Sequence, residues 1–280
     1  MLQQTKPDLA KIPGGWEPKA ELGWKLEDAA PRPMPQWSKI LMNDEAYLME
    51  NVLEPVNCKK LVKLFEDSHI EAPVGIQGKM NTSNPDEVGS KRATAWSEYL
   101  ADQLWKRMRY LMPQNKVCTD FTSTDWWQGD RERCLWRPCG ISPLLRFMRY
   151  QNGGQHFAHY DAGFIYPDDN YRTLMSFVLY LSDAEPSDGG STRFIMDGKK
   201  TQPVWERNHD DWDRPVNPSE VITEVHPKQG NILFFDHRLC HDVEPYHGEN
   251  PRIIVRGDII FTAVDVWHEG DYSVTAKIKE

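Results

Sequence analysis

From residue 144 onward, short apolar runs alternate with Gly, Pro and Asp positions, and the runs show no helical period. The runs are rich in β-branched and aromatic residues, and they span 144–150, 174–181, 192–195, 231–235 and 252–261. Runs of this length between turn residues are typical of strands in antiparallel sheets. The pattern therefore predicts a β-sandwich or barrel in the second half of the chain.

Two earlier segments repeat apolar residues at helical spacing. The first predicts a helix capped by Asn57, and the second predicts a helix that begins at Ser97 and ends at Pro113. Their apolar stripes are Leu61, Leu64 and Phe65 in the first helix and Leu100, Leu104, Met108 and Leu111 in the second. Such stripes face a core, so we expect both helices to support the predicted sheets.

The sequence pattern also predicts how the chain is divided into an N-terminal arm and one domain. Residues 1–37 carry six prolines with three tryptophans among them, which predicts an extended arm that docks on the body or binds a partner. Residues 38–280 then form a single domain, with helical support over 38–143 and the β core over 144–280. Within the core, residues 197–220 are polar and contain two tryptophans, so we expect a long loop that acts as a lid or is a surface ornament.

Composition narrows the class of protein. The chain has 280 residues, of which 39% are hydrophobic and 27% charged, and this is enough to bury a sizeable core. Its net charge of −9 and the lack of a long Lys/Arg run argue against a nucleic-acid partner. No apolar run approaches a membrane span, and no segment reads as a signal peptide. With an odd count of 5 cysteines, we expect a cytoplasmic protein with reduced thiols.

Two polar segments carry the candidate chemistry. His159 and Asp161 are two positions apart, so in a strand they share one face and can converge on a metal ion. His241 lies about eighty residues further on, just after the run 231–235. Two histidines and one carboxylate with open coordination positions suit non-haem Fe(II). By the same spacing argument, His156 is expected on the opposite face of its strand, and His237 is expected to be structural.

A third element follows the distal histidine. Arg252 lies eleven residues past His241, and Arg252, Ile254 and Arg256 share one face of a predicted strand. A guanidinium buried in an apolar barrel needs an anionic partner. A dicarboxylate co-substrate supplies such a partner through a bidentate pair.

The second half of the chain resembles the Fe(II)- and 2-oxoglutarate-dependent dioxygenases, most closely their prolyl 4-hydroxylase-like branch. The matching stretches, in order, are 145–150 leading to His159-Tyr160-Asp161, then 176–182, 189–194, 225–231, His241-x-Val243-x-Pro245 through Arg252, and 256–258. The helix that begins at Ser97 also resembles the helix before this core. Residues 1–90 carry nothing that aligns with the family.

This resemblance implies a double-stranded β-helix, or jelly roll, with flanking N-terminal helices, which is a mainly β fold of the α+β class. It implies Fe(II) held by His159, Asp161 and His241, with 2-oxoglutarate as co-substrate and O2 as oxidant. It also allows ascorbate as a reductant. The implied reaction is hydroxylation of an unactivated C–H bond in an amino acid, a peptidyl residue or a small natural product, while 2-oxoglutarate becomes succinate and CO2.

The resemblance also suggests how the co-substrate is held. It places the distal carboxylate of 2-oxoglutarate on Arg252, and it matches Tyr150 and Tyr180 to tyrosines that often hydrogen-bond the co-substrate. Many members of this branch have Lys where Arg252 stands, and the spacing here is longer by one residue. Arg256 is therefore the alternative for the anchoring role.

Two other classes of protein use the same residues differently. A non-catalytic, cupin-like jelly-roll protein would keep the metal for binding or sensing. A metallohydrolase would hold Zn(II) on the same three ligands. The intact set of ligands together with Arg252 argues against both, because a strand arginine that faces the metal has no obvious task in a hydrolase.

Overall fold

The structure is a computed structural model that describes residues 36–41, 45–67, 72–73, 89–110, 112, 116–118, 134–166, 171–198 and 215–266. The predicted arm over 1–37 lies outside these residues except for its last two positions. Most of the predicted loop over 197–220 also lies outside them.

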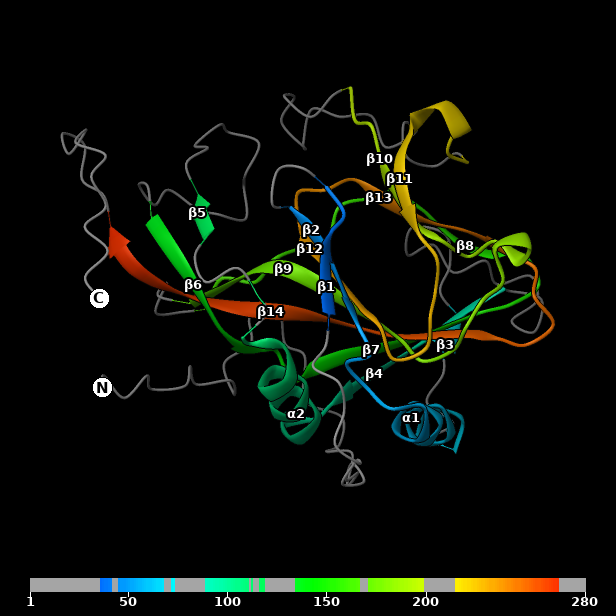
Figure 1. Ribbon diagram of the computed structural model, residues 1–280, viewed down its shortest axis with the longest axis horizontal. Helices are drawn as coiled ribbons and strands as arrows, with labels where there is room; N and C mark the ends of the chain where they lie inside the picture. Colours follow the sequence, from blue (N-terminus) through cyan, green and yellow to red (C-terminus); the bar gives the residue numbers. More distant parts are fainter. Residues whose placement is uncertain are drawn as a thin grey trace.

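Two antiparallel sheets form the body of the protein (Figure 1). The larger sheet contains β1 (Gln36–Lys39), β2 (Ala46–Glu50), β3 (Ala72–Pro73), β4 (Ser90–Trp96), β5 (Lys116–Cys118), β6 (Cys134–Ile141), β7 (Leu144–Tyr150), β9 (Tyr171–Tyr180), β12 (Ile232–Asp236) and β14 (Arg252–Val266). The smaller sheet contains β8 (Gly154–His159), β10 (Thr192–Ile195), β11 (Val221–Val225) and β13 (His241–Tyr246). The two helices are α1 (Pro55–Asp67) and α2 (Glu98–Met108).

From β7 to β14 the chain passes back and forth between the two sheets. The larger sheet has the order β12-β9-β14-β7 in this part, and the smaller sheet has the order β11-β10-β13-β8. Every one of these strand pairs is antiparallel. This connection of two facing four-stranded sheets is the jelly roll. The predicted fold class is therefore confirmed, and the predicted helical support over 38–143 holds α1 and α2 together with strands that extend the larger sheet.

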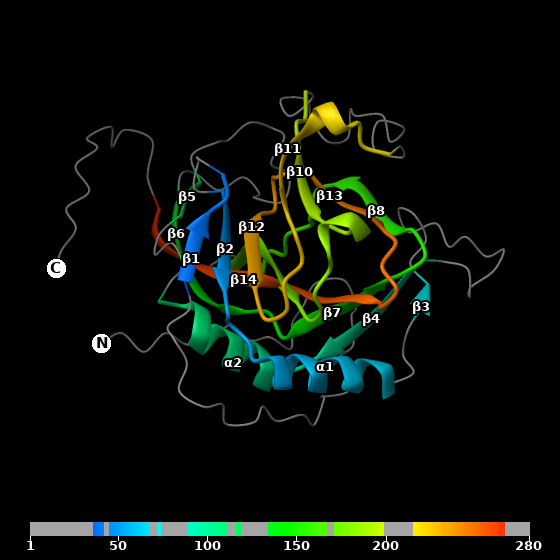
Figure 2. The ribbon, with the colours of Figure 1, turned by 45° about the vertical axis from the view of Figure 1, so that its right-hand side comes forward.

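The helices cover the outer face of the larger sheet (Figure 2). Phe65 of α1 stacks on Phe147 of β7 with ring centroids 5.4 Å apart, and both rings are buried. Ser97 caps α2 as predicted, since its hydroxyl accepts a hydrogen bond from the amide of Leu100 at 3.1 Å. The predicted caps fail elsewhere: α1 begins at Pro55, so Asn57 lies inside its first turn, and α2 ends at Met108, before Pro113.

Side chains of the central strands alternate between the helices and the space between the sheets. On β7, Phe147 packs in the core beneath the helices, whereas Tyr150 packs in the core between the sheets. On β14, Val255 faces the helices and Ile254 faces the space between the sheets. This alternation turns one face of each strand into a structural core and leaves the other to line a pocket.

The long apolar runs were predicted well, and short polar strands were missed. β7 and β10 have the predicted bounds, and β9, β12 and β14 overlap the predicted runs. No apolar run predicted β8, β11 or β13, and a strand at β8 was expected only from the spacing of its candidate ligands. Among the described helices, neither is long and apolar enough to cross a membrane.

Candidate metal centre and its pocket

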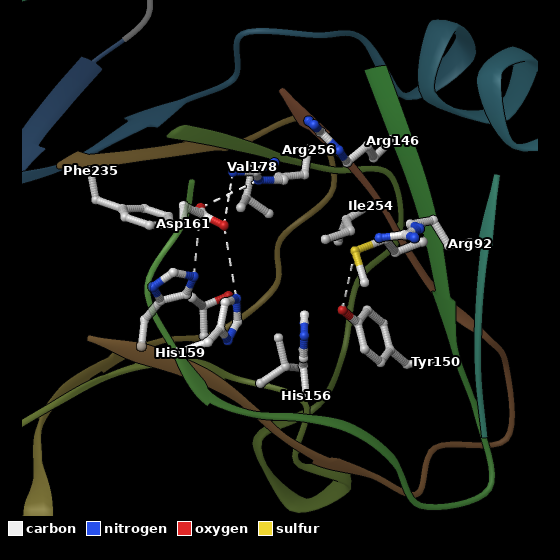
Figure 3. Close-up of a pocket in the computed structure, with 14 residues that line it drawn as sticks. Arg92, Arg146, Tyr150, His156, His159, Asp161, Val178, Phe235, Ile254 and Arg256 are labelled. Carbon is white, nitrogen blue, oxygen red and sulfur yellow. Dashed lines mark hydrogen bonds and ion pairs between the residues drawn. The ribbon is translucent and has the colours of Figure 1, made fainter. Parts of the chain in front are cut away.

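His159, Asp161 and His241 meet at the open side of the jelly roll. One ligand atom from each lies within 4.8 Å of the others. The Nε2 atoms of His159 and His241 lie 3.9 and 3.7 Å from the Asp161 carboxylate oxygens. Figure 3 shows Asp161 and His159 in the pocket, and His241 lines the same pocket. The structure therefore brings the three predicted residues together.

The convergence arises differently from the prediction. β8 ends at His159, where it pairs with His241 at the start of β13. Asp161 lies beyond the end of the strand, so the pair is not two alternate positions of one strand. Its carboxylate is held from the opposite sheet, since Ser176 of β9 donates a hydrogen bond to it and Arg256 of β14 forms an ion pair with it at 2.8 Å.

Backbone carbonyls orient both imidazole rings. The Nδ1 atom of His159 lies 2.7 Å from the carbonyl oxygen of Phe157, and the Nδ1 atom of His241 lies 2.9 Å from that of Leu239. A proton on Nδ1 that is donated to a carbonyl leaves Nε2 with its lone pair, which is the form that binds a metal. Burial lowers the pKa of His241 to about 3, so its ring is neutral at neutral pH.

Charge keeps the third residue ionised. Burial alone would raise the pKa of the Asp161 carboxyl, but the Arg256 guanidinium and the neighbouring histidines outweigh burial and hold it well below its usual range. An ionised carboxylate beside two imidazoles is a donor set for a divalent metal ion. The charge of Asp161 thus agrees with the geometry.

His156 faces the same pocket, contrary to the prediction that it points to the other face of the strand. The register of β8 and β13 shifts between the His159–His241 pair and the His156–Val243 pair. This bulge places one extra residue on β8 and cancels the alternation. The His156 ring therefore stacks on that of His159, with centroids 4.0 Å apart.

Arg252 is enclosed deeper in the barrel. Its side chain is fully buried, and its guanidinium lies over the rings of Tyr150 at 4.8 Å and Tyr180 at 5.7 Å. Its Nη2 atom donates a hydrogen bond to the hydroxyl of Thr192 at 3.4 Å. The same hydroxyl accepts a hydrogen bond from Tyr180 at 2.9 Å. The Nε and Nη1 atoms have no hydrogen-bond partner among the described residues. Burial lowers the pKa of this guanidinium.

Gly190 makes room for this arginine. Its φ is +80°, a left-handed backbone conformation that favours glycine. A Cβ atom built there would lie 2.9 Å from the Cδ atom of Arg252 and 2.8 Å from the ring of Tyr246. The glycine is therefore required both by the turn and by the close approach of the arginine.

Arg256, the alternative anchor, is already paired. Besides Asp161, it contacts Asp258, whose carboxylate lies 3.2 Å from the Arg256 guanidinium. Asp258 is fully buried and also pairs with Arg146 at 3.1 Å and with His237 at 3.3 Å. His237 thus lies behind the pocket in a structural position, as predicted, and not among the pocket-lining residues.

Sequence reasoning missed several residues that shape this site: Arg92, Arg146, His156, Ser176, Thr192 and Asp258. Arg92, Arg146, Ser176 and Asp258 lie on strands of the larger sheet, whereas His156 and Thr192 lie on strands of the smaller sheet. The face of Arg92 and Arg146 could have been inferred from the alternation with Ala93 and Phe147. The position of His156 could not, because a bulge leaves no simple trace in the sequence.

A comparison with protein families identifies this core. Residues 145–259 match the model of the 2OG-Fe(II) oxygenase superfamily, and this segment runs from β7 into β14. This segment therefore matches the 2OG-Fe(II) oxygenases, an enzyme class that uses Fe(II), 2-oxoglutarate and O2. The predicted superfamily is confirmed. A search of curated proteins found no match.

Solved structures with a similar fold include two prolyl hydroxylases. A viral collagen prolyl hydroxylase from Paramecium bursaria Chlorella virus-1, in complex with 2-oxoglutarate, has 15% identity and a TM-score of 0.44, covering 80% of this chain and 99% of that chain. A prolyl-4-hydroxylase from Pseudomonas putida has 17% identity and a TM-score of 0.41, covering 80% and 91%. HygX from Streptomyces hygroscopicus, with nickel, 2-oxoglutarate and hygromycin B bound, has 11% identity and a TM-score of 0.40, covering 80% and 86%.

The residues present fit both cofactors of this superfamily. The two imidazoles and the carboxylate form a donor set suited to Fe(II) with open positions. The buried Arg252, two of whose nitrogens have no hydrogen-bond partner among the described residues, is suited to a carboxylate group. The two features adjoin, because Tyr150 and Thr192 line the pocket of the triad and also contact Arg252.

Proposed function

We propose that the protein hydroxylates an unactivated C–H bond of an amino acid, a peptidyl residue or a small natural product. In this proposal His159, Asp161 and His241 hold Fe(II), and Arg252 binds the distal carboxylate of 2-oxoglutarate. When bound, the iron and 2-oxoglutarate supply the oxidation: O2 and 2-oxoglutarate are consumed, succinate and CO2 are released, and one oxygen atom enters the C–H bond.

One observation carries the proposal: a fully buried guanidinium, two of whose nitrogens have no hydrogen-bond partner in the described part of the chain, adjoins a cluster of two histidines and a carboxylate. Burying an unpaired charge is costly, so such a group indicates an anionic ligand that completes it. A structural metal or a hydrolytic zinc site gives the arginine no partner. A dicarboxylate that chelates the metal at one end and meets Arg252 at the other satisfies both features.

The remaining side chains orient these groups and exclude water. Tyr150 and Tyr180 hold the Arg252 guanidinium between their rings, while Thr192 fixes one of its nitrogens. We propose that the Tyr150 hydroxyl turns from the sulfur of Met148, 3.5 Å away, to the co-substrate. Burial raises the pKa of Tyr150 to about 12, so this hydroxyl keeps its proton at neutral pH and remains a donor.

Two measurements test the proposal. The protein is loaded with Fe(II) and incubated with 2-oxoglutarate, O2 and a panel of free amino acids, peptides and small natural products. We expect succinate to form faster in the presence of a substrate, whose product gains the mass of one oxygen atom. Substrate turnover that is equally fast without O2 would overturn the proposal.

A further inference from the structure

The pocket has a second cationic wall, which the iron and the co-substrate do not explain. Arg92 of β4 lies opposite Met148 of β7, so its side chain shares the inner face with Met148. It lines the same pocket as the metal triad. Figure 3 draws Arg92 on the side of the pocket away from His159 and Asp161.

Arg92 is exposed, and no described residue forms an ion pair or a hydrogen bond with it. This distinguishes it from the other arginines of the site. Arg146 and Arg256 are paired with buried carboxylates, and Arg252 is enclosed where the co-substrate is proposed to bind. Arg92 is therefore the guanidinium that a molecule entering the pocket can reach from solvent.

The charges around the pocket also favour an anionic ligand. Among the described residues that line it or contact its lining, four arginines (Arg92, Arg146, Arg252 and Arg256) face two aspartates (Asp161 and Asp258), which leaves two positive charges. Fe(II) and the dianion of 2-oxoglutarate cancel each other, so loading the site leaves this surplus in place. A neutral or cationic substrate would enter against it, whereas an anion would reduce it.

We propose that Arg92 receives a carboxylate of the substrate, so that the enzyme acts on a carboxylate-bearing molecule. A guanidinium fork matches a planar carboxylate in a bidentate pair. Met148, which lies opposite Arg92, and Ile254 also line the pocket, which suits an apolar carbon segment between this carboxylate and the C–H bond that reacts. This inference rests on the proposed function and names the substrate class of the same site.

A binding experiment tests the inference without knowledge of the substrate. The full-length protein is loaded with Mn(II) and saturating 2-oxoglutarate, which occupies the metal and Arg252. Butyrate and its neutral analogue butyramide are then titrated, and the paramagnetic relaxation of their protons is measured. The wild-type protein should bind butyrate about tenfold or more tightly than butyramide, the range of a charge-assisted hydrogen bond.

Two variants locate the effect. Arg92→Met should abolish the preference for butyrate. Lys91→Met, which removes the same charge from the neighbouring position on the other face of β4, should keep it. Equal preference in all three proteins, or no preference in the wild type, would overturn the role of Arg92. Failure of Mn(II) and 2-oxoglutarate themselves to bind would overturn the proposed function as well.

Measurements of turnover distinguish whether the carboxylate is an α-carboxylate or belongs to a side chain. Free L-amino acids present an α-carboxylate, and capped peptides with an internal aspartate or glutamate present only a side-chain carboxylate. Succinate formation stimulated by either group, and not by the matching primary amides, would support the inference and identify the source. Equal stimulation by acids and amides would overturn it.

Discussion

At the scale of single residues, Arg252 and Arg256 differ in what neutralises them, although both lie on the inner face of β14. Arg256 is paired with Asp161 and Asp258, whereas the described residues offer the Arg252 guanidinium one hydrogen-bond partner, Thr192, and two aromatic rings. The paired arginine therefore supports the folded state, and the unpaired one remains available for a ligand. This contrast favours Arg252 over Arg256 as the proposed anchor.

This contrast predicts opposite defects for the two arginines. Arg252→Met should weaken 2-oxoglutarate binding by a factor of about 30 to several thousand, equivalent to about 2–5 kcal/mol, and should not lower the free energy of unfolding. Arg256→Met should lower the free energy of unfolding by about 3–5 kcal/mol, because it leaves buried carboxylates uncompensated. Calorimetry with the Mn(II)-loaded protein and urea denaturation measure the two effects. A folded Arg256→Met protein with the larger binding defect would transfer the role.

The histidines of the pocket allow a matched test of metal binding. Removing a residue that only orients a ligand typically lowers metal affinity about 10–100-fold. His241→Ala should lower it by more than this. His156→Ala removes a ring that stacks on His159 in the same pocket, and it should stay within that range. Titration of both folded variants with Mn(II) decides. A larger loss of affinity in His156→Ala than in His241→Ala would mean that the assignment of His241 as a ligand is wrong.

At the scale of elements, the apolar runs predicted β7, β9, β10, β12 and β14, because two-sided burial leaves long hydrophobic stretches. The apolar pattern did not show β8 and β13, whose inner faces carry polar residues, and β8 was expected only from the spacing of its candidate ligands. The convergence of His159 and Asp161 with His241 was nevertheless predicted, because family-like spacing survives where periodicity is lost. The bulge in β8 and the tertiary partners of Asp161 depend on long-range pairing, which one sequence does not reveal.

The helices stabilise the sheet that carries the site. Phe65→Ala in α1 should lower the free energy of unfolding by about 3–5 kcal/mol, because it leaves a cavity against Phe147. Val56→Ala in the same helix removes an apolar side chain that is 43% exposed, and should cost about 0.5 kcal/mol or less. Urea denaturation compares them. Equal costs would mean that α1 does not pack on β7 as described.

At the scale of the whole molecule, a buried charge network joins the larger sheet to the candidate metal centre. Burial alone would raise the pKa of Asp258, but Arg256, His237 and Arg146 outweigh it and lower the pKa well below 3.8. A carboxyl whose folded pKa is depressed stabilises the fold above its unfolded pKa. This stabilisation is lost as the pH falls from 3.8 toward the folded pKa.

Acid should therefore reduce the contribution of Asp258 to stability. Asp258→Asn should destabilise the protein most at neutral pH, and the difference from wild type should shrink as the pH falls below 3.8. Asp102→Asn, in an exposed pair with Lys106 on α2, serves as the control and should show a small effect at every pH. Denaturation curves across this pH range test the linkage, and a difference for Asp258→Asn that does not change with pH would contradict it.

The most direct test of the central claim is the amount of succinate formed from 2-oxoglutarate by the protein loaded anaerobically with Fe(II) and then exposed to O2. The proposed function predicts that succinate forms over several turnovers, requires both Fe(II) and O2, and disappears in His241→Ala. Succinate formation that persists in His241→Ala, or that proceeds equally without iron, would contradict the assignment of the site. A wild-type protein that binds Fe(II) and 2-oxoglutarate yet forms no succinate would contradict the proposed reaction.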